Sequence, residues 1–85
     1  MFYFYVLKIS GVKDKKYYFG YTADLKNRVF QHQRNEVKTT KNKNAKLVYY
    51  EAYLNKYQAI KREKSIKISG SVRMALVKRL ENQNI

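Results

Sequence analysis

Arg28 and His32 are the residues whose types and spacing most clearly suggest chemistry. They lie four residues apart in a segment with helical periodicity, LKNRVFQH, so the guanidinium and the imidazole project from one face of a helix. Leu25 and Val29 share that face and would seat the helix on the core. Tyr18 precedes this segment, at the end of a short aromatic run. We expect Tyr18, Arg28 and His32 to converge on a phosphate, which a guanidinium binds with two hydrogen bonds.

A carboxylate in an apolar stripe is the second feature. If successive helical residues turn by about 100°, three apolar residues lie within about 60° of Glu63 on either side: Ala59, Ile60 and Ile66. A desolvated carboxylate has to be paired, protonated or bound to a cation. A structural salt bridge to a neighbouring lysine and a site for one divalent metal ion both remain open.

These groups match what hydrolysis of a phosphodiester requires, namely an activated water and positive charge on the phosphate. Arg28 would bind the scissile phosphate. Mg²⁺ needs only one or two carboxylates and completes its shell with water and substrate, so Glu63 alone can hold it. Tyr18 would position or deprotonate the attacking water. A phenol ordinarily has a pKa of about 10, so it needs nearby cations to act as a base.

Two further side chains depend on the fold for a role. His32 would relay the proton or hold Tyr18, and the alternative is a purely structural histidine. Tyr5 belongs to a strand expected to pair with the one that carries Tyr18, so the two rings would share one face. The chain contains nine tyrosines, and most of them must serve packing.

The other acidic residues and the absence of cysteine exclude several classes of site. Six scattered carboxylates offer no close pair for two-metal nuclease or glycosidase chemistry: Asp14, Asp24, Glu36, Glu51, Glu63 and Glu81. A chain without cysteine has no disulfide and no thiolate zinc site, which is typical of a reducing compartment. The longest apolar run, Phe2 to Leu7, is too short to span a bilayer. We therefore expect a soluble, cytoplasmic protein.

The formal net charge of +13 indicates a polyanionic partner. Nucleic acid fits better than a membrane surface, because the sequence has no clear amphipathic anchor. A polar, basic segment from Glu36 to Lys46 is expected to form a mobile loop. Its lysines would contact phosphates or simply be solvated: Lys38, Lys41, Lys43 and Lys46. A basic structural protein that binds RNA remains the alternative to an enzyme.

The first half of the chain predicts an antiparallel hairpin followed by a helix. Phe2–Ile9 and Tyr17–Tyr21 are rich in aromatic and β-branched residues and are expected to be strands, joined by a polar turn over 10–16. Gly20 near the end of the second strand indicates a bend or a close backbone approach. Thr22 or Asp24 would cap a helix that extends to about Arg34.

The second half predicts another strand and two helices. Leu47–Leu54 is continuously apolar, so we expect it to be the better-buried strand. Lys56 to about Ile68 is expected to be a helix closed by Gly70, after which Ser71 caps a last helix. The stripe of that helix would comprise Val72, Ala75, Leu76 and Leu80. The result is one α+β domain over residues 1–85, a small three-stranded, mainly antiparallel sheet flanked by helices.

The residues singled out above, in their order along the sequence, resemble the motifs of the GIY-YIG nuclease superfamily. Its first motif corresponds to Tyr3-Phe4-Tyr5 and its second to Tyr18-Phe19-Gly20. The motif arginine is Arg28, eight residues after the second glycine; the helical histidine or tyrosine is His32, and the later glutamate is Glu63. The whole chain is similar to short stand-alone bacterial members, related to the N-terminal incision domain of the excision-repair nuclease.

The resemblance implies a metal-dependent endonuclease of DNA repair that cuts one DNA strand, using one Mg²⁺ or Mn²⁺ ion and leaving 3′-hydroxyl and 5′-phosphate ends. It implies catalytic roles for Tyr5, Tyr18, Arg28, His32 and Glu63, with Glu63 as the metal ligand. The substrate would be DNA, with RNA as the alternative, and a partner protein would supply specificity.

Several positions depart from the family pattern. Tyr3 replaces a glycine, and Phe4 and Phe19 replace isoleucines. Tyr21 stands where some members carry a lysine, and Ala75 stands where some carry an asparagine. The alternative function is therefore a weak or inactive nucleic-acid-binding module of the same fold.

Overall fold

Three strands form one antiparallel sheet in the computed structural model, which describes residues 1–11 and 16–82. They are β1 (Phe2–Lys8), β2 (Tyr17–Thr22) and β3 (Lys46–Tyr53), in the order β2-β1-β3. The expected hairpin of β1 and β2 is confirmed. Asp14 and most of the turn expected over 10–16 lie outside the described residues.

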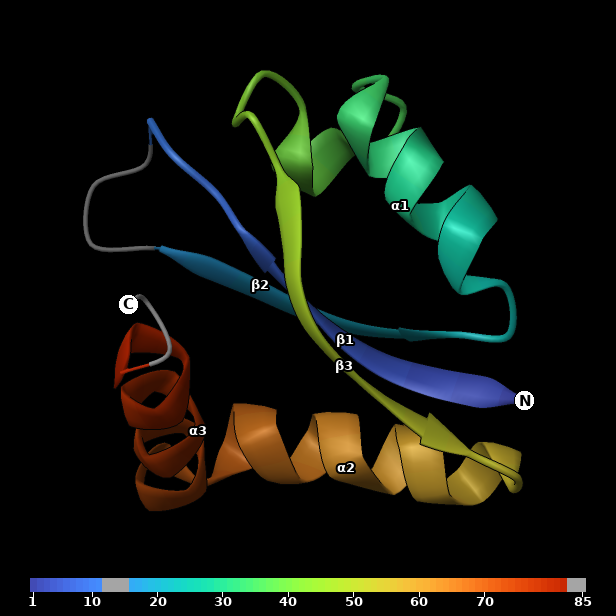
Figure 1. The fold of residues 1–85 in the computed structure, drawn as a ribbon, viewed down its shortest axis with the longest axis vertical. Coiled ribbons are helices and arrows are strands. Elements are labelled where there is room, and N and C mark those ends of the chain that lie inside the picture. The colour runs from blue at the N-terminus through green and yellow to red at the C-terminus, as the bar shows by residue number, and fades with distance from the viewer. Residues whose placement is uncertain (12–15, 83–85) are drawn as a thin grey trace.

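Helices cover both faces of the sheet (Figure 1). Helix α1 (Leu25–Gln33) lies on one face, and α2 (Lys56–Ile68) and α3 (Gly70–Asn82) lie on the other. A short 3₁₀ helix, η1 (Lys38–Thr40), precedes β3. The expected α+β class is confirmed. Within the described part of the chain, the helices are too short and too polar to cross a membrane.

The central strand β1 separates two hydrophobic clusters. Phe4 and Val6 face α2 and α3, whereas Tyr5 and Leu7 face α1, and all four are at most 1% exposed. The prediction that the third strand is the better-buried one is wrong. β3 is an edge strand whose residues alternate between exposed and half-buried, because the helices cover β1 and leave the border of the sheet open.

The helix termini differ in part from the sequence prediction. Asp24 caps α1 as expected, its Oδ1 accepting from the Asn27 N–H at 3.2 Å. The cap predicted at Ser71 is wrong, because the Ser69 hydroxyl accepts from the Val72 N–H. Gly70 is the first residue of α3 and does not close α2.

The predicted stripe of α3 is correct at three of its four positions. Leu76 and Leu80 are buried and Val72 is half-buried, all against the core. Ala75 is exposed instead. The helix begins at Gly70, two residues before the start that a cap at Ser71 would give, and the face that carries Ala75 is turned toward solvent.

The basic segment between α1 and β3, expected to be a mobile loop, is mostly irregular but contains η1 and is hydrogen-bonded at several points. Asn35 adopts φ 61° after the last turn of α1, where the N–H groups of Asn35 and Glu36 bond back to the carbonyls of His32 and Gln31. Asparagine tolerates this left-handed conformation better than most residues. Further along, Ser10 donates its N–H to the Lys43 carbonyl at 2.8 Å. These bonds fix the segment between α1 and β1.

Glu51 on β3 ties the sheet to α2. The guanidinium of Arg62 binds both oxygens of its carboxylate at 3.0 and 3.2 Å, and the hydroxyls of Tyr49 and Tyr53 also donate to it. Burial would raise the pKa of Glu51, but the hydrogen bonds and the charge of Arg62 outweigh burial and hold it below its usual value. All its acceptor positions are engaged, so we assign Glu51 a structural role.

Candidate active site

A hydrogen-bonded chain runs from Tyr5 on β1 through His32 on α1 to Thr40 on η1. The Tyr5 hydroxyl lies 3.0 Å from Nε2 of His32, and Nδ1 of His32 lies 2.6 Å from Oγ1 of Thr40. The Thr40 hydroxyl donates to the carbonyl of Val37, so its oxygen accepts from Nδ1–H. This assignment leaves Nε2 unprotonated, and the Tyr5 hydroxyl donates to it.

Thr40 is a residue that sequence reasoning missed. It is fully buried and lies in the segment expected to be a solvated loop. No motif marks a single threonine among lysines, and its contact with His32 depends on the turns that bring η1 back onto α1. Thr40, the third member of the hydrogen-bonded chain, is therefore identified only from the structure.

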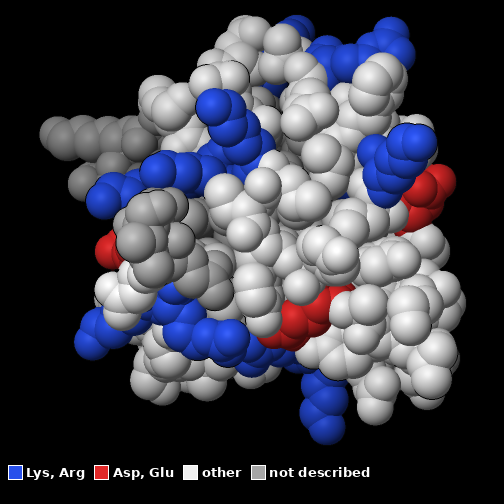
Figure 2. All heavy atoms as spheres, viewed as in Figure 1, with Lys and Arg blue, Asp and Glu red and all other residues white. Residues whose placement is uncertain are grey.

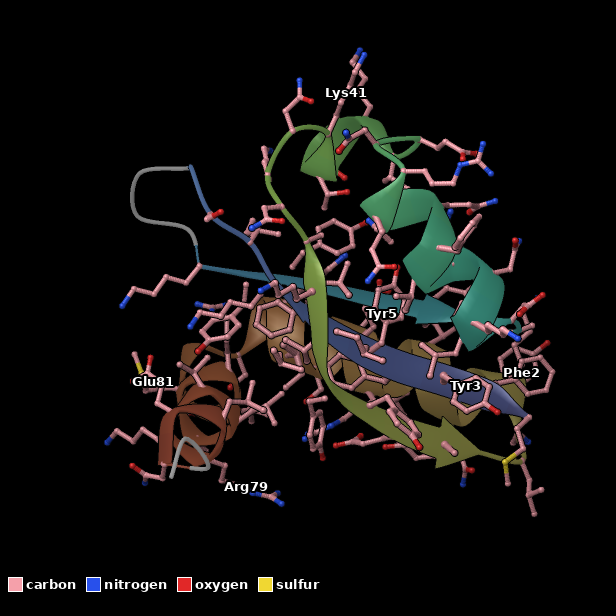
Figure 3. The ribbon with its side chains drawn as sticks, turned by 45° about the horizontal axis from the view of Figure 1, so that its top comes forward. Phe2, Tyr3, Tyr5, Lys41, Arg79 and Glu81 are labelled. Carbon is pink, nitrogen blue, oxygen red and sulfur yellow. The ribbon has the colours of Figure 1, made fainter. Side chains whose placement is uncertain are left out.

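Tyr18 on β2 lies on the same face as Tyr5 and His32, as expected. Its ring centroid is 5.1 Å from that of His32 and 6.4 Å from that of Tyr5. Figure 3 shows Tyr5 on β1, between the strand and α1. Two phenols and one imidazole thus share one small volume.

Gly20 makes room for the Tyr5 ring. The two residues are paired across β1 and β2, and a Cβ atom at Gly20 would lie 2.5 Å from the Tyr5 hydroxyl oxygen and 2.6 Å from Cζ. The sequence prediction of a close approach at this glycine is confirmed, and what approaches is a side chain.

We expect Gly20→Ala to lower the free energy of unfolding by about 1–3 kcal/mol, because the added methyl group displaces the Tyr5 ring and breaks its bond to His32. Urea titration followed by circular dichroism measures this loss. Gly70→Ala is the matched control, since its Cβ would meet only the end of Arg73 at 3.7 Å and alanine favours the helix. Equal stabilities of the two variants would contradict the role assigned to Gly20.

Arg28 and Glu63 both act on the Tyr5 hydroxyl. Burial raises the pKa of Tyr5 to about 12, and Tyr18 adds to this effect. The Arg28 guanidinium opposes it through its charge and its polar contact with the hydroxyl, whereas the charge of Glu63 raises the pKa further. The pKa of this phenol therefore depends on charges carried by α1 and α2.

Glu63 forms a salt bridge to a neighbouring lysine, one of the two roles that its sequence position left open. Nζ of Lys67 lies 3.3 Å from Oε1 of Glu63, but the lysine side chain is 53% exposed, and an exposed pair of this kind is weak. Among the described residues, Oε2 of Glu63 accepts no hydrogen bond, and no cluster of three or more His, Cys, Asp or Glu side chains could enclose a metal. The donor set fits a single ion that keeps several waters and shares a substrate phosphate.

His32 is neutral at physiological pH. It is 1% exposed, and burial, with a further contribution from the charge of Arg28, lowers its pKa to about 4. A neutral imidazole with Nε2 free of a proton accepts the hydrogen bond of the Tyr5 hydroxyl. The bond holds the phenol in a fixed orientation beside Tyr18.

The buried histidine predicts a pH dependence of stability. The unfolded chain binds a proton at His32 below about pH 6.5 and the folded chain only below about 4. Stability is therefore fully present above pH 6.5, is lost as pH falls from 6.5 to 4, and drops by about 2 kcal/mol between pH 7 and pH 5. Urea titrations at the two pH values measure this drop.

NMR gives an independent measurement of the same pKa, because His32 is the only histidine in the sequence. Its imidazole signals should not move between pH 7 and pH 5. A titration centred near pH 6.5, or equal stability at both pH values, would show that the imidazole is not desolvated.

The four lysines of the basic segment differ in exposure. Lys38 and Lys41 are exposed, Lys46 is exposed at the start of β3, and Lys43 is half-buried with Nζ bonded to the carbonyl of Thr39. Lys41 extends from the end of the molecule beyond η1 (Figure 3). Figure 2 shows Lys and Arg mostly around the periphery of one face, with few acidic side chains between them.

Comparisons with known proteins agree with the fold and the motifs. A family model described as the GIY-YIG catalytic domain matches residues 1–70. A protein of Pediococcus acidilactici, described as "UPF0213 protein in ldhD 5'region", is 36% identical over 66 residues, which cover 73% of this chain and 64% of that protein. No solved structure matches the chain significantly. The family match extends from β1 to the end of α2 and includes each motif that the resemblance rests on, and the chain therefore belongs to the GIY-YIG nuclease family.

Proposed function

We propose that residues 1–85 act as a single domain that hydrolyses a DNA phosphodiester with the aid of one divalent metal ion. The observation that supports this most is the convergence on the Tyr5 hydroxyl of the groups needed for that reaction. His32 bonds to it, Tyr18 lies beside it, and Arg28 and Glu63 both perturb it. The nuclease family of the chain makes nucleic acid the expected substrate.

Each side chain has a distinct role in this proposal. Arg28 binds the scissile phosphate and stabilises the charge that develops on it. Tyr18 positions or deprotonates the attacking water. The Tyr5 hydroxyl donates its hydrogen bond to Nε2 of His32, and Thr40 holds the imidazole in the tautomer that accepts it. The attacking oxygen forms the new bond to phosphorus as the bond to the 3′-oxygen breaks, which leaves 3′-hydroxyl and 5′-phosphate ends.

The metal ion belongs on Glu63. When bound there, Mg²⁺ or Mn²⁺ would polarise a phosphate oxygen and stabilise the leaving oxygen. Glu63 offers one carboxylate that is partly accessible and whose present partner, Lys67, is a flexible exposed side chain. If the lysine moved aside, the metal ion would replace it as the partner of the carboxylate, whose side chain is 19% exposed.

Binding of the DNA backbone would rest on the overall charge of +13 and on lysines near η1. Lys38, Lys41 and Lys46 are exposed and suited to contact phosphates, and Lys43 joins them if its bond to Thr39 opens. A partner protein would supply specificity for one substrate structure.

Two departures from the family pattern favour a second candidate, a nucleic-acid-binding module without activity. Tyr21 and Ala75 stand where some members carry a lysine and an asparagine. Ala75 is exposed on α3 and supplies no polar group. In this case the protein would bind DNA in a salt-dependent way and have no metal affinity at Glu63.

The deciding experiment is a cleavage panel. Labelled duplex, nicked, branched and single-stranded DNA, with matching RNA, are incubated with the protein and Mn²⁺ or Mg²⁺, and again with a chelator. Cutting of any DNA that the chelator abolishes supports the nuclease. Salt-sensitive binding without cutting of any substrate would favour the binding module, and cutting of RNA alone would change the substrate class.

A further inference from the structure

A groove with a volume of about 640 Å³ adjoins the candidate site. It follows the outer edge of β2, on the side away from β1, and reaches from η1 to α3. Tyr18 belongs both to the site and to the wall of this groove. The remaining lining residues are Lys16, Tyr17, Phe19, Thr39, Lys67, Arg73, Met74 and Val77.

Among the described residues, the lining combines cations with flat and apolar surfaces and includes no acidic side chain. Lys16, Lys67 and Arg73 supply positive charge. Arg73 is held in place because its NH1 donates to the carbonyls of Ile66 and Lys67 at 3.2 and 3.3 Å. Tyr17 and Phe19 offer ring surfaces, and cations beside aromatic rings are the combination that binds single-stranded nucleic acid.

We propose that this groove holds an unpaired nucleotide that flanks the scissile phosphodiester, so the protein selects DNA with a single-stranded segment next to the cut. The inference rests on the proposed function and names the structure of its substrate. A base in a duplex is stacked on both faces and shows only its edges, so it cannot lie against these side chains. An unpaired base can enter the groove while its phosphate meets the three cations.

Two residues of the groove, Tyr18 and Lys67, also contact the candidate active site. Tyr18 lies 5.1 Å from His32 between ring centroids, and Lys67 both lines the groove and bonds to Glu63. A strand that places one phosphate at Arg28 would therefore continue directly past Tyr18. A metal ion on Glu63 would release Lys67 toward the neighbouring phosphate.

Binding without metal tests the inference independently of cleavage. The probes are a blunt DNA duplex and the same duplex with a short single-stranded flank that carries 2-aminopurine. We expect the wild type to bind the flanked probe about tenfold more tightly, the effect of one stacked base. The 2-aminopurine fluorescence should fall at the flanking position that enters the groove.

Met74→Glu places a negative charge in the groove at a side chain that is already 55% exposed, so the fold should tolerate it. The preference for the flanked probe should disappear in this variant. Leu54→Glu is the matched control, since Leu54 is 83% exposed and does not line the groove. It introduces the same charge and should keep the preference.

The outcomes separate this inference from the proposed function. Two results would contradict the proposal that the groove holds an unpaired nucleotide, whatever the cleavage panel shows. One is equal binding of both probes by the wild type, and the other is equal loss of preference in Met74→Glu and Leu54→Glu. A preference lost only in Met74→Glu supports it, even if no DNA is cut. Equal cleavage of blunt and flanked DNA would support the nuclease proposal and contradict the proposal for the groove.

Discussion

Glu63→Gln should lower the rate of DNA cleavage about a hundredfold to a thousandfold at saturating Mn²⁺. The amide keeps the size of the side chain but removes the negative charge that binds the metal, and the phosphate then loses its main electrostatic stabilisation. Single-turnover cleavage of a labelled substrate measures the rate. Calorimetric titration with Mn²⁺ should show binding to the wild type that is absent in the variant.

DNA affinity without metal should be unchanged or slightly higher in Glu63→Gln, because the substitution removes one negative charge from a cationic surface. Glu36→Gln is the matched control. Glu36 carries the same group but is paired with Arg34 at an exposed position, so its variant should cut and bind metal like the wild type. Similar cleavage rates for wild type and Glu63→Gln would remove Glu63 from the chemistry and leave its salt bridge to Lys67 as its role.

The sequence predicted the parts of the site that depend on local periodicity. Arg28 and His32 share a helix face because they lie four residues apart, and Leu25 and Val29 seat that face on the cluster around Tyr5. Gly20 signalled a close contact because glycine is unfavourable within a strand unless space is needed. These inferences need only the geometry of one helix or one strand pair.

The parts that failed depend on which elements meet. Apolar character alone could not show that β3 lies at the edge, since that is decided by strand pairing, and both β2 and β3 pair with β1. The basic segment is polar throughout, yet Thr40 is buried because η1 folds back onto His32. Ser69 and Ser71 are equivalent as caps in sequence, and only the end of α2 selects Ser69.

Tyr5→Phe should lower the cleavage rate constant about tenfold to a hundredfold, because the site loses the hydroxyl that is bonded to His32 and helps to fix its geometry. The ring still fills the space over Gly20, so the loss of stability should be limited to one hydrogen bond to His32, about 1 kcal/mol. Cleavage rates measured beside urea titrations separate these two effects. A loss of activity without a matching loss of folding would place Tyr5 in the reaction.

Tyr18→Phe distinguishes the two phenols. In the proposed reaction Tyr18 handles the proton of the attacking water, whereas the hydroxyl of Tyr5 is engaged with Nε2 of His32. Tyr18→Phe should therefore lose more activity than Tyr5→Phe. An equal or smaller loss in Tyr18→Phe would contradict proton transfer by Tyr18 and limit it to positioning the water.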